Sequence, residues 1–310
     1  MIEKPVIAIV GPTASGKSEL GIALALKIGG EIINCDSVQV YQGIEIATAK
    51  VPLAEQRGIP HHLLDFVPPS VKYTAADWAR AAVQTINEIE RRGNVAILVG
   101  GTGFYLRALR EPLFESPKTD GRLRQRLQEI HEERGAEFLH RMLARLDPVS
   151  AAKLFPADYV RVGRALEYRF QTGKRFSEYQ PLRAEPPELA ARLKIFALNP
   201  PRQQLYERIN RRAENHFDNG LVEETKRLLA DGVPADSNAL GAHGYRRVVE
   251  YLRGERSLES AVEQTKLDVR HYAKRQLTWF RREPDVVWLE GFGDDPNVQN
   301  MLINLLLIQS

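Results

Sequence analysis

The sequence predicts an α/β protein with a parallel central sheet into which a helical segment is inserted. Apolar runs at Val6–Val10 and 94–99 each lead through a glycine-rich turn, and the helical pattern that follows the first run is typical of a sheet with helices on its faces. Further along, the strand pattern stops and long, strongly charged helical patterns begin. We therefore expect a core formed by residues 1–114 and 184–310, with a helical insertion of residues 115–183.

Composition limits the class of protein. With 310 residues, of which 43% are hydrophobic, the chain can bury a large core. Its net charge, 43 − 40 = +3, is too small by itself to indicate nucleic-acid binding, so local clusters must decide. The single cysteine, Cys35, excludes an internal disulfide and a cysteine zinc cluster. Because we find no signal-peptide pattern and no apolar run long enough for a bilayer, we expect a cytoplasmic protein without membrane partners.

The turn after the first apolar run has the pattern Gly-x-x-x-x-Gly-Lys-Ser and lies between a strand and a helix. Backbone N–H groups of such a turn, with the helix N-terminus behind them, attract an anion. Lys17 can reach a terminal phosphate and the hydroxyl of Ser18 can bind Mg²⁺. The pattern thus predicts a phosphate or diphosphate site made by Gly11, Pro12, Thr13, Ala14, Ser15, Gly16, Lys17 and Ser18.

Two further loops are expected at the same edge of the sheet. Asp36 follows a predicted strand at 31–35, and it is a magnesium ligand, a general base or a helix N-cap. The turn from Gly100 to Gly103 follows the strand at 94–99, and it either approaches a ligand closely or is needed only for packing. Together with the first turn, these loops predict one crevice lined by three βα loops.

The remaining segments are mostly helical and basic. Residues 202–230 should form a long helix broken at Asn219-Gly220. Its arginines Arg208, Arg211 and Arg212 lie near a phosphate or in surface salt bridges. Residues 123–146 read as one charged helix of the insertion. His61-His62 reads as a pair of loop histidines and not as a metal site.

Basic and aromatic residues interleave on a predicted helix at 267–282. This composition suits unpaired nucleotides, whose phosphates bind cations and whose bases stack on rings. The alternative is that Trp279 and Phe280 belong to the core and that the charges are merely solvated. Two other functions remain open: a small-molecule kinase that uses the same phosphate loop, and an RNA-binding protein in which this loop is a regulatory switch.

The combined motifs resemble the tRNA dimethylallyltransferase (tRNA isopentenyltransferase) family in its bacterial form. The resemblance covers nearly the whole chain, and the order and spacing of the motifs match. It is carried by Gly-Pro-Thr-Ala-Ser-Gly-Lys-Ser at 11–18, Asp-Ser-Val-Gln-Val-Tyr at 36–41, Thr-Ala-Lys at 48–50, Gly-Gly-Thr-Gly-Phe-Tyr at 100–105, Arg-Ala-Leu-Glu at 164–167, Thr-Gly-Lys at 172–174 and Lys-Arg-Gln-Leu-Thr-Trp-Phe-Arg at 274–281.

The resemblance implies a P-loop nucleotide-kinase-like core and an activity. The family transfers a dimethylallyl group from dimethylallyl diphosphate to N6 of adenine 37 in tRNA, beside the anticodon, with Mg²⁺ as cofactor. By resemblance, Asp36 is the general base, Thr102 lies near the reacting amine, and Arg212 contacts the diphosphate, although its neighbour Arg211 competes for that role. We expect a monomer whose partner is the tRNA anticodon stem-loop.

The resemblance also implies which residues contact tRNA. One group would read the extruded base, and the others would hold the anticodon arm. These residues are Asp36, Ser37, Val38, Gln39, Thr102, Arg124, Val160, Arg161, Val162, Gly163, Arg164, Arg270, Lys274, Arg275 and Gln276.

Overall fold

The computed structural model describes residues 4–111, 117, 120–178 and 187–307. The chain forms two compact units, one of Met1–Glu111 with Pro186–Ser310 and one of Pro112–Glu185. The boundaries predicted for the insertion, 115 and 183, lie outside the described residues. Each unit is described by itself below.

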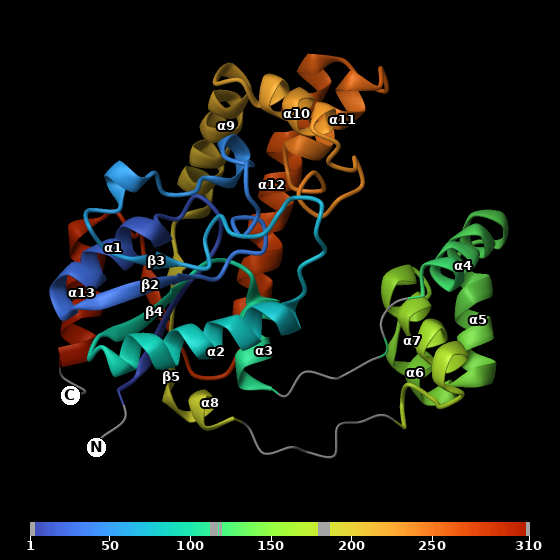
Figure 1. Ribbon diagram of the computed structural model, residues 1–310, viewed down its shortest axis with the longest axis horizontal. Coiled ribbons are helices and arrows are strands. Elements are labelled where there is room, and N and C mark those ends of the chain that lie inside the picture. Colours follow the sequence, from blue (N-terminus) through green and yellow to red (C-terminus); the bar gives the residue numbers. More distant parts are fainter. Residues whose placement is uncertain (1–3, 112–116, 118–119, 179–186, 308–310) are drawn as a thin grey trace. The chain divides into compact units, whose positions relative to one another are not determined.

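The first unit is built on a six-stranded, all-parallel sheet with the order β3-β2-β4-β1-β5-β6, which confirms the predicted fold class (Figure 1). The prediction that His61-His62 lies in a loop is wrong, because these residues pair with β2 as an edge strand. The last strand was not predicted either. The strands are β1 Val6–Val10, β2 Gly30–Asn34, β3 His61–His62, β4 Val95–Val99, β5 Leu193–Asn199 and β6 Val286–Glu290.

Helices cover both faces of this sheet. In Figure 1, α1 and α13 lie on one side and α2 and α3 on the other, while α9 to α12 gather beyond the carboxyl ends of the strands. The predicted break at Asn219-Gly220 is confirmed, since Gly220 has φ 93° between α9 and α10. The helices are α1 Lys17–Ile28, α2 Ala75–Arg91, α3 Gly103–Arg110, α8 Glu188–Arg192, α9 Arg202–Asp218, α10 Leu221–Ala230, α11 Tyr245–Leu252, α12 Leu258–Phe280 and α13 Pro296–Leu307. Among the described residues, no helix is long and apolar enough to cross a membrane.

The described residues of the second unit form four helices: α4 Gly121–Arg134, α5 Ala136–Leu146, α6 Pro148–Lys153 and α7 Tyr159–Thr172. The single helix predicted for 123–146 is in fact two, because Gly135 has φ 78° and separates α4 from α5. Leu139, Leu143 and Leu166 are buried in the core of this unit.

A buried carboxylate fixes one edge of the sheet. Glu31 on β2 accepts hydrogen bonds from Arg92 (2.7 and 3.1 Å) and Asn94 (2.7 Å) in the turn before β4. His62 of β3 lies 2.6 Å from the same carboxylate. The hydrogen bond from Arg92 is the main cause that lowers the pKa of Glu31 to about 2. One side chain therefore joins three neighbouring parts of the sheet.

We predict that Glu31→Gln lowers the free energy of unfolding by about 1–3 kcal/mol, because it replaces charge-assisted hydrogen bonds. Since the folded-state pKa of Glu31 is lowered, its contribution is present above the unfolded pKa and disappears as the pH falls through about 2. Urea unfolding between pH 7 and 2 should show the wild-type advantage shrinking with acid. An advantage that is independent of pH would contradict this account.

Candidate active site

The turn after β1 is held in a strained, left-handed shape. Gly11 and Gly16 have φ 136° and 84°, and Ala14, which carries a Cβ, has φ 61°. A Cβ at Gly16 would lie 2.9 Å from the backbone nitrogen atoms of Gly293 and Asp294. The segment after β6 therefore supports this loop from behind and requires glycine there.

The loop carries groups that suit an anion. Lys17 donates a hydrogen bond to the carbonyl of Pro12 (2.6 Å), and burial lowers its pKa to about 8, so it is still mostly charged at pH 7. The hydroxyl of Ser15 is buried and, among the described residues, has no hydrogen-bond partner. An unpaired buried hydroxyl beside a lysine is a site that a phosphate oxygen can complete.

A cavity of about 650 Å³ opens in front of this loop. Six of the eight predicted diphosphate residues, Thr13 to Ser18, line it together with Asp36 and Arg212. Gly11 and Pro12 are buried and do not line it. Gly11 instead packs against Leu198, where a Cβ would lie 3.0 Å from the carbonyl oxygen. These two residues shape the loop, and their predicted contact with the diphosphate stays a prediction.

Gln276 on α12 ties two of the predicted loops together. Its Oε1 accepts a hydrogen bond from the backbone N–H of Thr13 (2.8 Å), and its Nε2 donates to the carbonyl of Gly101 (2.9 Å). The side chain is only 4% exposed. Both ends of its amide are therefore engaged inside the protein, which makes Gln276 a residue that positions the phosphate loop. Its predicted contact with tRNA stays a prediction.

The glycines of the second turn make room for protein atoms. A Cβ at Gly100 would lie 2.1 Å from the carbonyl oxygen of Cys35, and one at Gly101 would lie 2.0 Å from Nε2 of Gln276. A Cβ at Gly103 would lie 2.2 Å from the ring of Trp279. These distances show that packing alone requires glycine at all three positions. Gly100 also lines the first cavity, so a close approach to a ligand stays a prediction at that position.

Asp36 lies between two cavities of the candidate site. Its Oδ1 accepts hydrogen bonds from the backbone of Val38 (2.9 Å) and Gln39 (3.5 Å), and its Oδ2 has no partner among the described residues. No helix follows Asp36, so the helix N-cap alternative is wrong and the carboxylate caps a turn. Asp36 lines both the first cavity and a second one of about 360 Å³.

The second cavity indicates which arginine of α9 belongs to the candidate site. Arg212 lines both cavities, whereas Arg211 is exposed and Arg208 pairs with Asp294 (2.9 Å). Burial lowers the pKa of Arg212, and the nearby Asp36 opposes that shift. The geometry therefore favours Arg212 over Arg211 as the arginine of the site.

The sequence analysis missed several residues of the second cavity. His216 lies one turn after Arg212, and burial together with this arginine lowers its pKa to about 4, so it is neutral near pH 7. The spacing of four residues on one helix could have revealed it. The stretch around Ser237 to His243 and Tyr272, four residues before Gln276, also lines the cavity.

Thr102 lies at the start of α3 beside the Asp36 turn. Its Oγ1 accepts a hydrogen bond from the backbone N–H of Ser37 (3.0 Å) and donates one to the side-chain hydroxyl of Ser37 (3.3 Å). Ser37 and Val38 line the second cavity, and Gln39 lines the first, where its amide donates to the carbonyl of Thr48 (2.9 Å). Residues 37–39, which we expected to contact the extruded base, therefore border both cavities.

The residues of α12 that we expected to contact tRNA have different surroundings in the structure. Arg270 donates a hydrogen bond to Asn210 (2.8 Å), and Lys274 is exposed near the start of α9. The guanidinium of Arg275 lies over the ring of Tyr272. Phe280 is fully buried, so for this residue the core alternative is correct.

Two residues of the helical unit that we expected to contact tRNA are buried. The side chain of Val162 is fully buried in the core of that unit, so it cannot contact tRNA, and Gly163 beside it is buried as well. Val160 remains 74% exposed. Arg124 and Arg164 both pair with the buried Glu167, and Arg161 pairs with Asp158.

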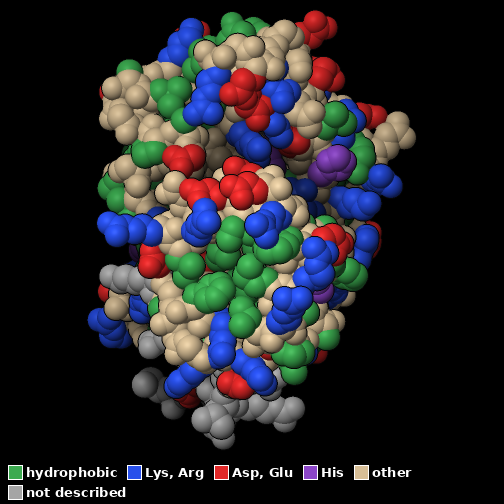
Figure 2. All heavy atoms as spheres, turned by 90° about the vertical axis from the view of Figure 1, so that its right-hand side faces the viewer, with side chains coloured by type: hydrophobic (Ala, Val, Ile, Leu, Met, Phe, Trp, Pro, Cys, Tyr) green, Lys and Arg blue, Asp and Glu red, His purple; other side chains and the backbone are tan. Residues whose placement is uncertain are grey.

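Exposed apolar and basic side chains occur together on the surface. Figure 2 shows a face on which hydrophobic side chains gather in one area with Lys and Arg around them. In the helical unit, Val149, Phe155 and Phe170 are among the exposed hydrophobic residues. Such a mixture suits an RNA surface, where phosphates bind cations and bases bind apolar groups.

Comparison with known proteins identifies the class. A family model described as IPP transferase matches residues 39–283. Because this match spans well over half of the chain, the chain belongs to the IPP transferase family.

The relatives within this family carry a more specific name. A tRNA dimethylallyltransferase of Solibacter usitatus is 48% identical over 295 residues, which cover 95% of each chain. A tRNA dimethylallyltransferase of Geobacter metallireducens is 47% identical over 93% of each chain.

Solved structures agree. The tRNA isopentenylpyrophosphate transferase of Bacillus halodurans has a TM-score of 0.72 at 37% identity, over 99% of this chain and 96% of that one. A eukaryotic dimethylallyltransferase acting on tRNA has a TM-score of 0.79 at 30% identity, over 99% of this chain and 80% of that one.

We predict that Gln276→Ala lowers the free energy of unfolding by about 1–3 kcal/mol, because it leaves the N–H of Thr13 and the carbonyl of Gly101 unpaired in a buried place. Diphosphate affinity, measured by calorimetry, should also fall at least tenfold as the loop loosens. The control is Gln276→Glu, which keeps the acceptor for Thr13 but loses the donor to Gly101. It should retain more diphosphate affinity than the alanine variant, and the reverse order would contradict the bridging role.

Proposed function

We propose that this chain transfers a dimethylallyl group from dimethylallyl diphosphate to N6 of adenine 37 in tRNA, giving N6-isopentenyladenosine and diphosphate. The observation that carries the proposal is the position of Asp36, which borders both the phosphate-loop cavity and the second cavity. A donor diphosphate in the first and an acceptor base in the second would meet at this carboxylate. We further propose that the enzyme works as a cytoplasmic monomer.

The chemistry requires a base at this meeting point. The lone pair of an adenine N6 is delocalised into the ring, so the amine is a weak nucleophile. As its C–N bond to the dimethylallyl carbon forms and the C–O bond to diphosphate breaks, the amine becomes acidic and a nearby carboxylate can take its proton. Since Oδ1 of Asp36 is used by the backbone of Val38 and Gln39, Oδ2 is the oxygen left to accept that proton. Thr102, whose Oγ1 is fixed by Ser37, lies beside this turn and can orient the amine.

The leaving diphosphate requires positive charge. As the carbon–oxygen bond breaks, charge accumulates on the oxygen that leaves, and N–H groups of the loop, Lys17 and Arg212 can stabilise it. Ser18, at the start of α1, and the diphosphate oxygens would hold Mg²⁺, whose chemistry is to neutralise phosphate charge. The unpaired hydroxyl of Ser15 is a further donor for this anion.

The acceptor base must leave its stack before it can enter the second cavity. Unstacking costs a few kcal/mol, and less in a loop than in a duplex, which favours a nucleotide of the anticodon loop. We propose that Arg124, Arg161 and Arg164 of the helical unit, with Arg275 of α12, hold the anticodon arm through its phosphates. The exposed Val160 would contact the arm through its apolar side chain.

We predict N6-prenyl adenosine when the protein is incubated with Mg²⁺, labelled dimethylallyl diphosphate and an anticodon stem-loop. In Asp36→Asn, turnover should fall about 10²–10⁴-fold, the range of general-base catalysis, while RNA affinity changes little. Asparagine is a matched replacement because its oxygen can still accept from Val38. Nucleoside analysis after digestion gives the readout, and ATP hydrolysis without prenyl transfer would instead support a kinase.

Arg211 and Arg212 provide a matched pair on one helix. We predict that Arg212→Ala lowers kcat/KM for the prenyl diphosphate about 10²–10³-fold, because one donor to the developing charge is removed. Arg211→Ala removes the same charge from an exposed position and should stay within about threefold. Equal losses in steady-state assays of the two variants would contradict the assignment of Arg212 to the diphosphate.

A further inference from the structure

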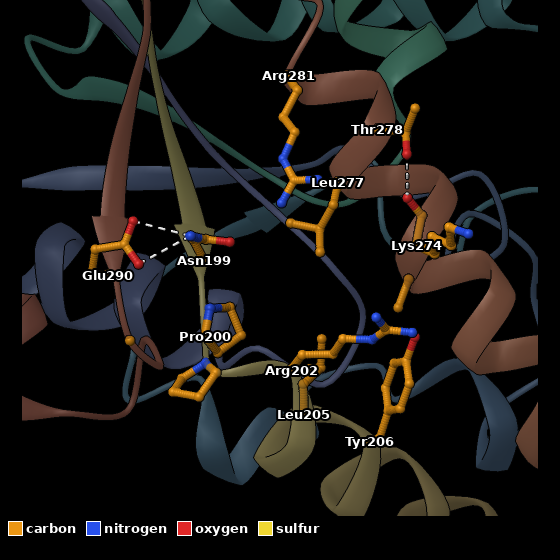
Figure 3. A pocket seen from close by; sticks show the side chains of 13 residues that line it. Asn199, Pro200, Arg202, Leu205, Tyr206, Lys274, Leu277, Thr278, Arg281 and Glu290 are labelled. Atoms are coloured by element: carbon orange, nitrogen blue, oxygen red, sulfur yellow. Dashed lines mark hydrogen bonds between the residues drawn. The ribbon is translucent and has the colours of Figure 1, made fainter.

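The two cavities at Asp36 share a wall that comes from the segment after the Asp36 turn. This wall is the short 3₁₀ helix η1, Ile46–Thr48, with Ala49 after it. Thr48 lines both cavities, Ala47 lines the second and Ala49 lines the first. A third cavity, of about 580 Å³ at the ends of β5 and β6, shares no lining residue with either of them (Figure 3). The position of η1 therefore affects the shape of both cavities of the candidate site.

The conformation of this wall requires support from its surroundings. Ala49, which follows the three residues of η1, has φ 50° although it carries a Cβ. Such a left-handed residue persists only where neighbouring groups hold it. The hydroxyl of Thr48 donates to the nearby carbonyls of Ile44 and Glu45 (2.9 Å each), so it does not join η1 to another element. The support for η1 must come from other side chains.

Two buried side chains from α10 and α11 hold the start of this wall. Oε1 of Glu224 accepts hydrogen bonds from the backbone N–H groups of Glu45 (3.1 Å) and Ile46 (3.3 Å). It also accepts one from the hydroxyl of Tyr245, whose oxygen in turn accepts from the N–H of Ala47 (3.4 Å). Glu224 is 6% exposed and Tyr245 is fully buried. Because a buried N–H group without a partner is costly, these two side chains fix three successive N–H groups of the wall.

The other side of the wall is bonded to the turn that holds Asp36. Nε2 of Gln39 donates hydrogen bonds to the carbonyls of Thr48 (2.9 Å) and Ala49 (3.2 Å). The backbone N–H of Gln39 donates to Oδ1 of Asp36 (3.5 Å), and that of Val38 donates to the same oxygen (2.9 Å). A continuous series of hydrogen bonds therefore runs from α10 and α11 through η1 to the carboxylate of Asp36.

We infer that Glu224 and Tyr245 are positioning residues of the transfer reaction, because they hold η1, and through it the Asp36 turn, in the geometry that the reaction requires. Neither residue lines a cavity at Asp36, so both act through η1. The phosphate loop has a separate support, the amide of Gln276. The effect on turnover rests on the proposed function, whereas the hydrogen bonds to η1 exist without any ligand.

Tyr245→Phe tests this role, because it removes only the hydroxyl and keeps the buried ring. With dimethylallyl diphosphate and the anticodon stem-loop as substrates, kcat should fall about 10–100-fold, since a small misplacement of a catalytic group has an effect of this size. Calorimetry with inorganic diphosphate and Mg²⁺ should show an unchanged affinity, because Gln276 still holds the phosphate loop. A variant that is merely unstable would lose both turnover and diphosphate affinity.

Substitutions in α10 provide the controls. Glu224→Gln keeps an oxygen acceptor for the N–H groups of the wall and should retain more of kcat than Glu224→Ala, which removes it. Glu223→Gln removes an equal charge from the neighbouring exposed residue. It should leave both kcat and diphosphate affinity at their wild-type values.

Amide hydrogen exchange measures the support of η1 without turnover. In Tyr245→Phe, residues 45–47 and 38–39 should exchange faster than in the wild type, while β1 and α1 keep their rates. Faster exchange at these positions together with the selective loss of kcat supports the inference. Unchanged exchange there, an unchanged kcat, or an equal loss of kcat and diphosphate affinity would overturn it. A wild-type protein that transfers no prenyl group would contradict the proposed function, whereas the exchange rates would still decide whether these two residues support η1.

Discussion

The candidate site depends on one buried amide. Gln276 holds the backbone of the phosphate loop through Thr13 and the backbone of the second turn through Gly101. These loops follow β1 and β4, which are neighbours in the sheet, while Gln276 comes from a helix more than 170 residues later in the chain. A single side chain thus fixes the distance between two loops and the helix that closes the site, which is the preorganisation that phosphate binding requires.

The same constraint explains the glycines. With Gln276 and Trp279 pressed against the second turn, and the backbone of Cys35 against its first residue, no side chain fits at Gly100, Gly101 or Gly103. The glycine-rich sequence of this turn therefore reflects the close approach of α12 and β2. In the first turn, by contrast, the Ser15 hydroxyl, which has no partner in the described part of the chain, and Lys17 can face an anion. Two turns of similar composition serve different purposes.

Much of this arrangement could be predicted from the sequence, and the exceptions have physical reasons. The strand, turn and helix around Lys17 follow from local pattern, and so does the break at Gly220. The strand at His61–His62 could not be found, because two residues carry no periodicity and their position depends on pairing with β2. The second cavity escaped notice for a similar reason: His216 and Tyr272 come from different helices, and only packing places both at one cavity.

The charges of Lys17, Arg212 and Asp36, which lie close to where the two cavities meet, affect the stability of the free protein. Lys17 and Arg212 both have lowered pKa values, mainly because of burial, and each is opposed by the single carboxylate of Asp36. The free protein therefore holds two half-buried cations against the carboxylate of Asp36, which lowers the stability of the folded state. In the reaction that we propose, a bound diphosphate would supply the missing negative charge and would thereby stabilise the folded protein. Its release after the reaction would restore the imbalance of charge, and the site would then attract the next charged donor.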